Sequence, residues 1–510
     1  MCGIVALVGR PSARPVPDAA DLIARLDAAV DVRHDIDEAT RLLTDVDRLL
    51  HGVPGVRALV DQRQLVTTIE DRLDRFDTVI TDWESRLDDG RVDDLESDAR
   101  RLGALRDVLW AIRRDRLRTA AEVAKLAGRD ASVAAIAGYS MIQQALSILD
   151  RLEVRGRDSA GVHLFVWGHD LRADDPSVVN AMSGRADDVL FQNRSVRWVD
   201  TDRGGVLSFV YKAAAEIGEL GDNTRALRRA IADDDLLRLA LSRPDARMSL
   251  TGHTRWASVG IISEPNAHPV NSERLAASSG PYVVASLNGD VDNHADLRVA
   301  YELEFAHQIT TDAKVIPALV AHHMGSTSDL VESFRRSVST FEGSVAIAAA
   351  SADDPNRLLV SLRGSGQGLF VGFSEDLYVV ASEPYGVVEE TSRYVRMDGE
   401  ATVDGVAGQI VVLDGERAGT VDGFRRISFG GTERPWSDRD LVTAEVTTRD
   451  IDRGDAPHFL LKEIGEAPVS LAKTLRGKIR DDGGRLRTDL GERTIPADVA
   501  DRLADGSIDK

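Results

Sequence analysis

The chain opens with a short, uninterrupted run of apolar residues. Gly3 to Val8 carries no charge and is partly β-branched, and Gly9 and Arg10 end it. Apolar runs of this length, closed by a turn residue, are typical of buried strands. We therefore expect the N-terminus to lead directly into a central strand, with Cys2 at its start.

The hydrophobic period becomes helical between about Pro17 and Gly138. In this Asp- and Arg-rich stretch, apolar residues alternate spacings of three and four at Val66, Ile69, Leu73, Phe76, Ile80, Trp83 and Leu87. The spacing predicts a heptad seam, the coiled-coil pattern that packs against another helix. Gly52–Gly55 and Asp88–Gly90 predict turns between helices. We interpret residues 11–138 as an inserted helical hairpin or bundle, removable between residues 17 and 137 without unfolding the core. A module that binds a partner protein is the alternative.

Short strands dominate the second half of the chain. Ile142, Ala145, Leu146 and Leu149 predict one helix, and residues 162–166 a strand, before a polar stretch at 168–205 that predicts a second insertion or a long loop. Strands are expected at 282–287, 345–349, 358–362 and 377–381, and a helix at 312–323. The alternation predicts an α+β fold of stacked antiparallel sheets with helices outside. Residues 431–510 are charged and irregular, with helices expected at 468–475 and 496–503, and predict a linker.

Composition and charge exclude several classes of protein. The net charge of −21 argues against a nucleic-acid partner, which needs clustered Lys and Arg. A single cysteine excludes an intramolecular disulfide and a CxxC zinc site. No basic segment precedes the first apolar run, and no stretch approaches the roughly 18 apolar residues of a membrane span. We expect a cytoplasmic protein with no metal and no cofactor.

Cys2 combines two chemical groups once Met1 is removed. Its thiol is a nucleophile, and its free α-amino group, with a pKa near 7.7–8 in model compounds, can accept a proton at neutral pH. N-terminal-nucleophile hydrolases use this arrangement. A small, buried apolar residue in a strand is the alternative interpretation of Cys2 alone.

Five ordered strings resemble the class II glutamine amidotransferases. They are Cys2–Val5, Arg155–Gly161, Thr251–Ser258 with Asn266–Pro269, Leu287–Asp290 with Asn293, and Thr311–Asp312. Within that superfamily the chain is most similar to the glutamine–fructose-6-phosphate aminotransferases, because Trp256 follows the arginine, Arg363-Gly364-Ser365 precedes Ala381-Ser382-Glu383, and 459–479 resembles their interdomain segment.

The resemblance implies a fold and a set of roles. The fold is a four-layer αββα sandwich, here an interrupted domain over residues 2–430. Cys2 would attack the amide of L-glutamine, and Asn288 with the N–H of Gly289 would form the oxyanion hole. In the substrate site, Arg255 would grip the carboxylate and Asp312 the ammonium group; Trp256, Ser258 and Arg155 would complete it.

Taken singly, these residues have ordinary structural interpretations. Arg255 alone predicts a surface ion pair, Asn288-Gly289 a hairpin turn, and Asp312 a helix N-cap. His253 and His268 are interpreted as structural, with no role in proton transfer. Gly364, Gly366 and Gly368 suggest a phosphate loop, but the strand-like Leu369–Val371 that follows them does not fit one.

The chain also departs from the family. Val259 stands where a histidine that contacts glutamine is usual, and Val154 and Arg157 replace two tyrosines. Lys510 falls near the point where two sugar-isomerase domains would begin. We expect either a fragment or a subunit whose partner accepts ammonia on fructose 6-phosphate, and a homo-oligomer. An amidotransferase for another acceptor and a non-catalytic scaffold or regulatory homologue are the alternatives.

Overall fold

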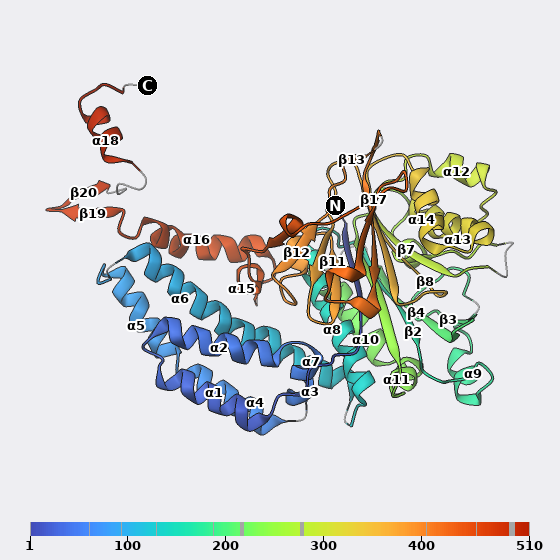
Figure 1. Ribbon diagram of the computed structural model, residues 1–510, viewed down its shortest axis with the longest axis horizontal. Coiled ribbons are helices and arrows are strands. Elements are labelled where there is room, and N and C mark those ends of the chain that lie inside the picture. Colours follow the sequence, from blue (N-terminus) through green and yellow to red (C-terminus); the bar gives the residue numbers. More distant parts are fainter. Residues whose placement is uncertain are drawn as a thin grey trace. The chain divides into compact units, whose positions relative to one another are not determined.

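Two antiparallel sheets form the centre of the larger of two compact units (Figure 1). The computed structural model describes residues 2–508 except 61, 93, 129, 187, 215–218, 276–279, 404, 455 and 489–494. In spatial order, the nine-stranded sheet consists of β18 (Leu441–Thr443), β12 (Arg393–Arg396), β10 (Phe370–Phe373), β11 (Leu377–Ala381), β1 (Gly3–Gly9), β5 (Arg247–Arg255), β2 (Ser159–Trp167), β4 (Gly204–Ala214) and β3 (Val196–Thr201). The seven-stranded sheet consists of β17 (Glu433–Arg434), β16 (Phe424–Ile427), β15 (Gln409–Asp414), β9 (Arg357–Arg363), β8 (Val345–Ser351), β7 (Val283–Gly289) and β6 (Val270–Asn271). The strands predicted at the N-terminus, 162–166, 282–287, 345–349, 358–362 and 377–381 are all present.

Strand β1 occupies a central position in the larger sheet. It pairs with β11 on one side, where Val5 lies opposite Ala381, and with β5 on the other, where Val5 lies opposite Gly252. Ile4 to Val8 are fully buried. The apolar character of the N-terminus therefore reflects burial on both faces of a sheet, as expected.

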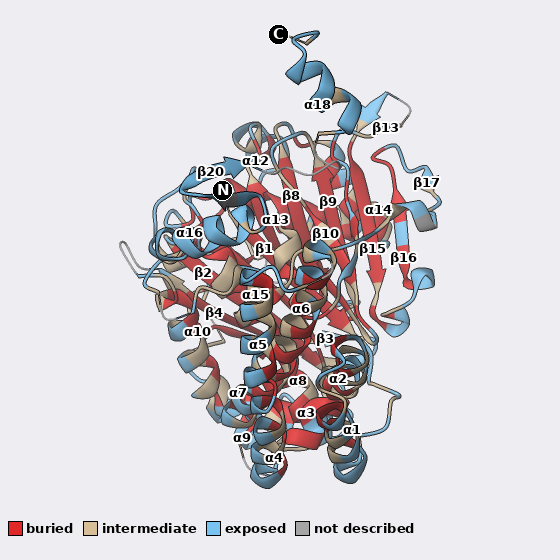
Figure 2. Ribbon diagram, turned by 90° about the vertical axis from the view of Figure 1, so that its left-hand side faces the viewer, coloured by how far each residue is buried: buried red, intermediate tan, exposed pale blue. Residues whose placement is uncertain are grey.

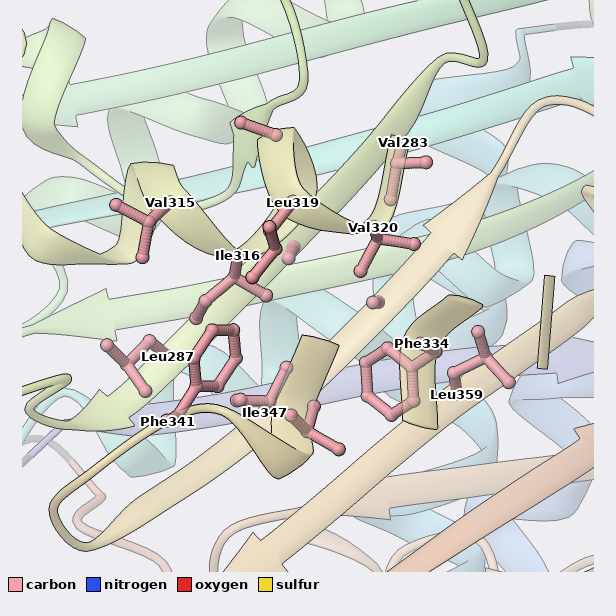
Figure 3. Close-up of a cluster of buried hydrophobic side chains, with 14 of the residues drawn as sticks. Val283, Leu287, Val315, Ile316, Leu319, Val320, Phe334, Phe341, Ile347 and Leu359 are labelled. Carbon is pink, nitrogen blue, oxygen red and sulfur yellow. The ribbon is translucent and has the colours of Figure 1, made fainter. Parts of the chain in front are cut away.

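Alternate residues of the seven-stranded sheet enter two different cores. Val284 of β7 packs into the core between the sheets, whereas Val283 and Leu287 pack against helices on the opposite face. Figure 3 shows this second core, in which Val315 and Leu319 lie beside the strand residues. The two-residue period of β7 is thus satisfied by one sheet and one helical layer.

Helices cover the outer faces of both sheets. α8 (Val133–Leu152) packs on β1 and β5, and α10 (Asp222–Ala232) on β2 and β4. On the other side, α13 (Val315–Thr327) and α14 (Leu330–Ser339) pack on β7 and β9. The order helix, sheet, sheet, helix confirms the predicted αββα sandwich. Shorter helices of this unit are α3 (Gly52–Leu59), α7 (Arg118–Ala127), α9 (Pro176–Met182), α11 (Asp235–Leu241), α12 (His294–Ala300) and α15 (Thr448–Ile451), with a π-helix, η1 (Ala111–Leu117), before α7.

A buried ionic cluster lies beside α8. The carboxylate of Glu389 accepts hydrogen bonds from Arg151 (2.6 Å), Ser147 (2.9 Å) and Thr119 (3.2 Å). Thr119 belongs to α7, within the segment that we expected to be removable. Compact packing likewise assigns residues 47–66 and 111–452 to one unit with the sheets. Deleting residues 17–137 would therefore remove part of this unit, and that expectation is withdrawn.

A second unit is assembled from three stretches, residues 22–46, 67–110 and 453–510. Its elements are most of α1 (Ala19–Asp31), α2 (Ile36–Leu50) and α4 (Arg63–Asp74), with α5 (Asp77–Asp88), α6 (Leu95–Trp110), α16 (Phe459–Leu475), β19 (Ile479–Asp482), β20 (Arg485–Thr488) and α18 (Ala497–Ala504). Ion pairs join its helices, such as Arg72 to Asp27 (2.8 Å) and Arg101 to Asp37 (2.8 Å). α16 and α18 contain no buried residue (Figure 2).

The helical insertion differs in detail from the heptad prediction. The predicted seam does not run along a single helix, because α4 ends at Asp74 and α5 begins at Asp77. The turn between them is closed by the hydrogen bond from Phe76 N–H to Leu73 O (3.0 Å). Beyond this turn Val79 is buried in place of Ile80. The turn predicted at Gly52–Gly55 is also wrong, because these residues begin α3. The turn at Asp88–Gly90 is confirmed.

Two regions expected to be irregular contain sheet strands or helices. Residues 168–205 include α9 and the edge strand β3. Past residue 430, β17 and β18 extend the two sheets. Across the described part of the chain, we find no helix with the length and apolar character needed to cross a membrane.

Candidate active site

Cys2 lies immediately before β1 and is half-buried. Its Sγ accepts a hydrogen bond from the backbone N–H of Trp256 (3.2 Å) and lies 3.4 Å from the carbonyl oxygen of the same residue. The next residue is Gly3, where a Cβ would lie 2.7 Å from the side chains of both Leu152 and Thr254. Glycine is therefore required here for β1 to bring the thiol against the end of β5.

The environment of the thiol favours its protonated form. Burial raises the pKa of Cys2, and the Trp256 N–H and the charge of Arg255 only partly offset this effect. A thiol of this kind needs a base to become a nucleophile. Met1, whose removal would expose the α-amino group as that base, lies outside the described residues.

The loop between α8 and β2 holds the segment that faces the thiol. Gly156 lies against the peptide between Arg255 and Trp256, where a Cβ would lie 2.6 Å from the Arg255 carbonyl carbon and 2.8 Å from the Trp256 nitrogen. Asp158 donates its N–H to Arg255 O (3.1 Å) and accepts the N–H of Ala257 (2.8 Å). These contacts explain why glycine and aspartate occur at these two positions of the 155–161 string.

Arg255 is a buried cation at the end of β5, 3% exposed. Its guanidinium donates to the carbonyl oxygens of Val259 and of Ile261 (3.2 Å for Ile261). Burial lowers the pKa of Arg255, whereas Cys2 and Asp312 act in the opposite direction. Arg255 is therefore not the surface ion pair that its sequence alone predicts, and it carries positive charge beside the thiol.

Asn288 and Gly289 end β7 on the opposite sheet. The Nδ2 of Asn288 donates to the carbonyl oxygen of Cys2 (3.0 Å), which brings together residues 286 positions apart. Gly289 has φ of +87°, and a Cβ there would lie 1.9 Å from the carbonyl oxygen of Ser344. Backbone conformation and close approach both require glycine at this position.

Asp312 begins a short 3-10 helix, η3 (Asp312–Lys314), and Ser258 lies in the loop that follows β5. The Oδ2 of Asp312 accepts the N–H of Val291 (2.8 Å), and burial raises the pKa of this carboxyl group. Ser258 donates its hydroxyl to Asp290 Oδ1 (2.6 Å). Trp256 is 60% exposed, which leaves its indole free to contact a ligand.

Arg155 is held by two residues that the sequence interpretation gave no role at the site. It pairs with Glu383 (2.6 Å) and donates to the hydroxyl of Tyr385 (3.1 Å). Both follow β11, the neighbour of β1. Glu383 occurs in the Ala381–Glu383 string, so a signal for it existed, whereas none pointed to Tyr385.

Three of the residues that depart from the family pattern, Val259, Val154 and Arg157, occupy different surroundings. Val259 contributes its carbonyl oxygen to Arg255, and Arg157 contributes its carbonyl oxygen to Asn223 Nδ2 (2.9 Å). Val154 is exposed. Val259 and Arg157 thus make backbone contacts that do not depend on the identity of the side chain. Across the described residues, no group of three or more His, Cys, Asp and Glu side chains is arranged to hold a metal ion.

The sequence is similar to curated enzymes over about half its length. It is 32% identical over 256 residues to glutamine–fructose-6-phosphate aminotransferase (isomerizing) of Geobacillus kaustophilus, covering 50% of this chain and 38% of that enzyme. The same enzyme of Oceanobacillus iheyensis is 30% identical over 259 residues, covering 51% and 38%. The predicted family resemblance is confirmed. No protein-family model matches the sequence.

The similarity to these enzymes covers only part of their length. The chain spans less than half the length of these relatives. Among solved structures, the glutamine phosphoribosylpyrophosphate amidotransferase of B. subtilis aligns with 56% of this chain and 46% of its own, at 17% identity and a TM-score of 0.34.

Proposed function

We propose that this chain hydrolyses L-glutamine through a thioester on Cys2 and releases ammonia. The observation that supports the proposal is the hydrogen bond from Asn288 Nδ2 to the backbone carbonyl oxygen of Cys2 (3.0 Å), which joins the end of β7 to the residue that carries the thiol. The buried Arg255 carries a positive charge that acts to lower the pKa of the Cys2 thiol. Similarity to glutamine-dependent aminotransferases supports the choice of substrate.

The reaction begins with proton transfer. The α-amino group of Cys2 takes the thiol proton, and Sγ attacks the side-chain carbonyl carbon of glutamine. Negative charge on the oxygen is stabilised by Asn288 Nδ2 and the Gly289 N–H. The ammonium formed on Cys2 then protonates the leaving nitrogen, ammonia departs, and water hydrolyses the thioester to glutamate.

The remaining side chains bind the ends of the substrate. The guanidinium of Arg255 has the planar donor geometry that matches the α-carboxylate. Asp312 provides the anion for the α-ammonium group. Trp256 covers the bound amino acid, Ser258 lines its site, and Arg155 supports the loop beside the nucleophile.

Glutamate release by the purified chain tests this proposal. Mass spectrometry first establishes that Met1 is absent. We expect glutaminase activity in the wild type, none in Cys2→Ala, and inactivation of the wild type by the glutamine-mimicking electrophile diazo-oxo-norleucine. A processed wild type that neither releases glutamate nor reacts with this electrophile would refute the proposal.

The ammonia acceptor is proposed to be fructose 6-phosphate, bound by a sugar-isomerase domain or subunit in a homo-oligomeric assembly. The printed activity of the relatives supports this acceptor. Glucosamine 6-phosphate formation is measured with the chain in its cellular assembly, supplied with glutamine and fructose 6-phosphate. Glutamate release without amino-sugar formation would reject the acceptor and leave the glutaminase reaction standing.

A further inference from the structure

The side-chain amide of Asn288 is bonded at both ends. Its Oδ1 lies 3.0 Å from Nε2 of His253, on β5, and its Nδ2 donates to Cys2 O (3.0 Å). His253 is fully buried and Asn288 is 1% exposed. Since β5 and β7 belong to different sheets, the His253–Asn288 bond crosses the interior of the sandwich.

The ring of His253 donates in this bond. Burial lowers the pKa of His253 to about 3, so the imidazole is neutral at physiological pH and carries one N–H. Nδ1 makes no well-aligned hydrogen bond among the described residues, although the Leu287 backbone interacts with the ring and acts to raise its pKa, so a proton on Nδ1 would be buried without a well-aligned acceptor. With the proton on Nε2, the ring donates to Asn288 Oδ1.

The reverse orientation of the Asn288 amide would bring two hydrogen-bond acceptors together. Rotating the amide by half a turn would place Oδ1 against the carbonyl oxygen of Cys2, where neither atom carries a hydrogen. It would also turn the –NH₂ group, with its second hydrogen, away from the thiol. The second hydrogen is the one left to reach the developing oxyanion.

His253 is itself held in place by a neighbouring ring. The centroid of His268 lies 4.6 Å from that of His253. His268 bonds through Nε2 to Thr311 Oγ1 (3.0 Å), and its Nδ1 lies 3.2 Å from Leu287 O. The orientation of His253 is therefore fixed by packing as well as by Asn288.

We propose that His253 is a positioning residue that sets the rotation of the Asn288 amide, so that its –NH₂ group faces the oxyanion formed on glutamine. The inference rests on the proposed glutaminase reaction and deepens it. It assigns His253 no proton transfer and no contact with substrate. The effect of His253 is on the transition state, because the Asn288 amide stabilises the negative charge that develops there on the oxygen of glutamine.

Three variants and two readouts test this role. His253→Phe removes the donor, and His253→Gln retains an N–H that can reach Oδ1. The matched control is His163→Phe. His163, on β2, is also buried, and its Nε2 is hydrogen-bonded to the side chain of Ser208, on β4 (2.9 Å to Oγ). The readouts are kcat and KM for glutamine hydrolysis, and the rate at which iodoacetamide alkylates Cys2.

Loss of one oxyanion donor typically lowers kcat by about 10²–10³-fold, and we expect about 10²-fold for His253→Phe with little change in KM. His253→Gln should recover most of this loss. Iodoacetamide needs no oxyanion hole, so its rate should match the control. A kcat for His253→Phe equal to that of His163→Phe would overturn the inference, and so would failure of His253→Gln to recover activity. An inactive wild type would instead refute the proposed function.

A measurement on the wild type remains decisive if the phenylalanine variant does not fold. Nitrogen-15 NMR of histidine-labelled protein distinguishes the protonated ring nitrogen from the bare one. We expect His253 to carry its proton on Nε2. A proton on Nδ1 would overturn the inference.

Discussion

The backbone N–H of Trp256 donates to the Sγ of Cys2 over 3.2 Å, and the peptide that makes this bond rests on Gly156. A methyl group at residue 156 would lie 2.6 Å from that peptide. The position of the thiol relative to β5 therefore depends on a glycine 154 residues away from it in the sequence.

We expect Gly156→Ala to displace this peptide and lower kcat for glutamine hydrolysis, with overpacking that costs about 1–3 kcal/mol of unfolding free energy. Chemical denaturation and glutaminase assays measure the two effects. Unchanged stability together with unchanged kcat would show that the loop accommodates the methyl group.

Gly289→Ala should be more damaging. The substitution combines a left-handed φ, which costs about 1–3 kcal/mol in a non-glycine residue, with a severe overlap against Ser344 O. Gly325→Ala is the matched control, because it lies inside α13 with no atom within 4 Å of the added Cβ. Chemical denaturation should show a lower free energy of unfolding for Gly289→Ala and a free energy of unfolding about 0.5–1 kcal/mol higher for Gly325→Ala. Equal effects at the two sites would contradict the prediction.

Arg255→Lys should weaken glutamine binding more than it slows chemistry. Lysine keeps the charge but loses the planar fork, which here also holds the Val259 and Ile261 carbonyls. We expect KM to rise about 10- to 100-fold, equivalent to roughly 1.5–3 kcal/mol for a charge-assisted bond. Arg247→Lys, at the other end of β5, serves as control and should leave KM unchanged. A KM for Arg255→Lys like that of the control would exclude the carboxylate role.

Asp115 should make stability depend on pH. Burial raises the pKa of Asp115 to about 7, and the nearby Glu389 carboxylate adds to this effect. Glu389 keeps its charge because Arg151, Ser147 and Thr119 donate to it, whereas Asp115 Oδ2 accepts from Thr448 (2.6 Å) and Oδ1 has no partner among the described residues.

A raised carboxyl pKa contributes stability that is complete below the unfolded value and is lost as pH rises through the folded value. The contribution of Asp115 is therefore lost between pH 3.8 and about 7. Asp115→Asn should melt at a higher temperature than the wild type at pH 7.5, and the advantage should vanish toward pH 4. Asp235→Asn, with a side chain 95% exposed, is the control. A difference between Asp115→Asn and wild type that is constant across this range would contradict the assignment.

Local patterns predicted the sheets better than they predicted the helical segments. Strands such as β1 and β7 carry short apolar runs that end at a glycine, so Ile4–Val8 and Val283–Leu287 could be predicted as buried strands. The seam through Phe76 kept its spacing across a turn, and hydrophobic period alone does not distinguish one long helix from two short ones.

The site residues were available from their ordered motifs, but their contacts were not. Nothing local to His253 indicates that its ring meets Asn288 across the sandwich, because the partner comes from another sheet. Tyr385 reaches Arg155 only through the pairing of β11 with β1. These relationships depend on topology, which brings together residues 35 positions apart in the first case and 230 in the second.

The central position of β1 in its sheet also determines when this strand can pair with both neighbours during synthesis. Its partners are β5 and β11, and β11 ends at Ala381. At about 5–20 residues per second, synthesis of the chain from β1 to that residue takes on the order of 20–80 s. Throughout this interval β1 lacks its partner strand on the side of β11. The proposed glutaminase reaction requires Met1 to be removed from Cys2, and this order of strand pairing would leave time for that step before the sheet closes.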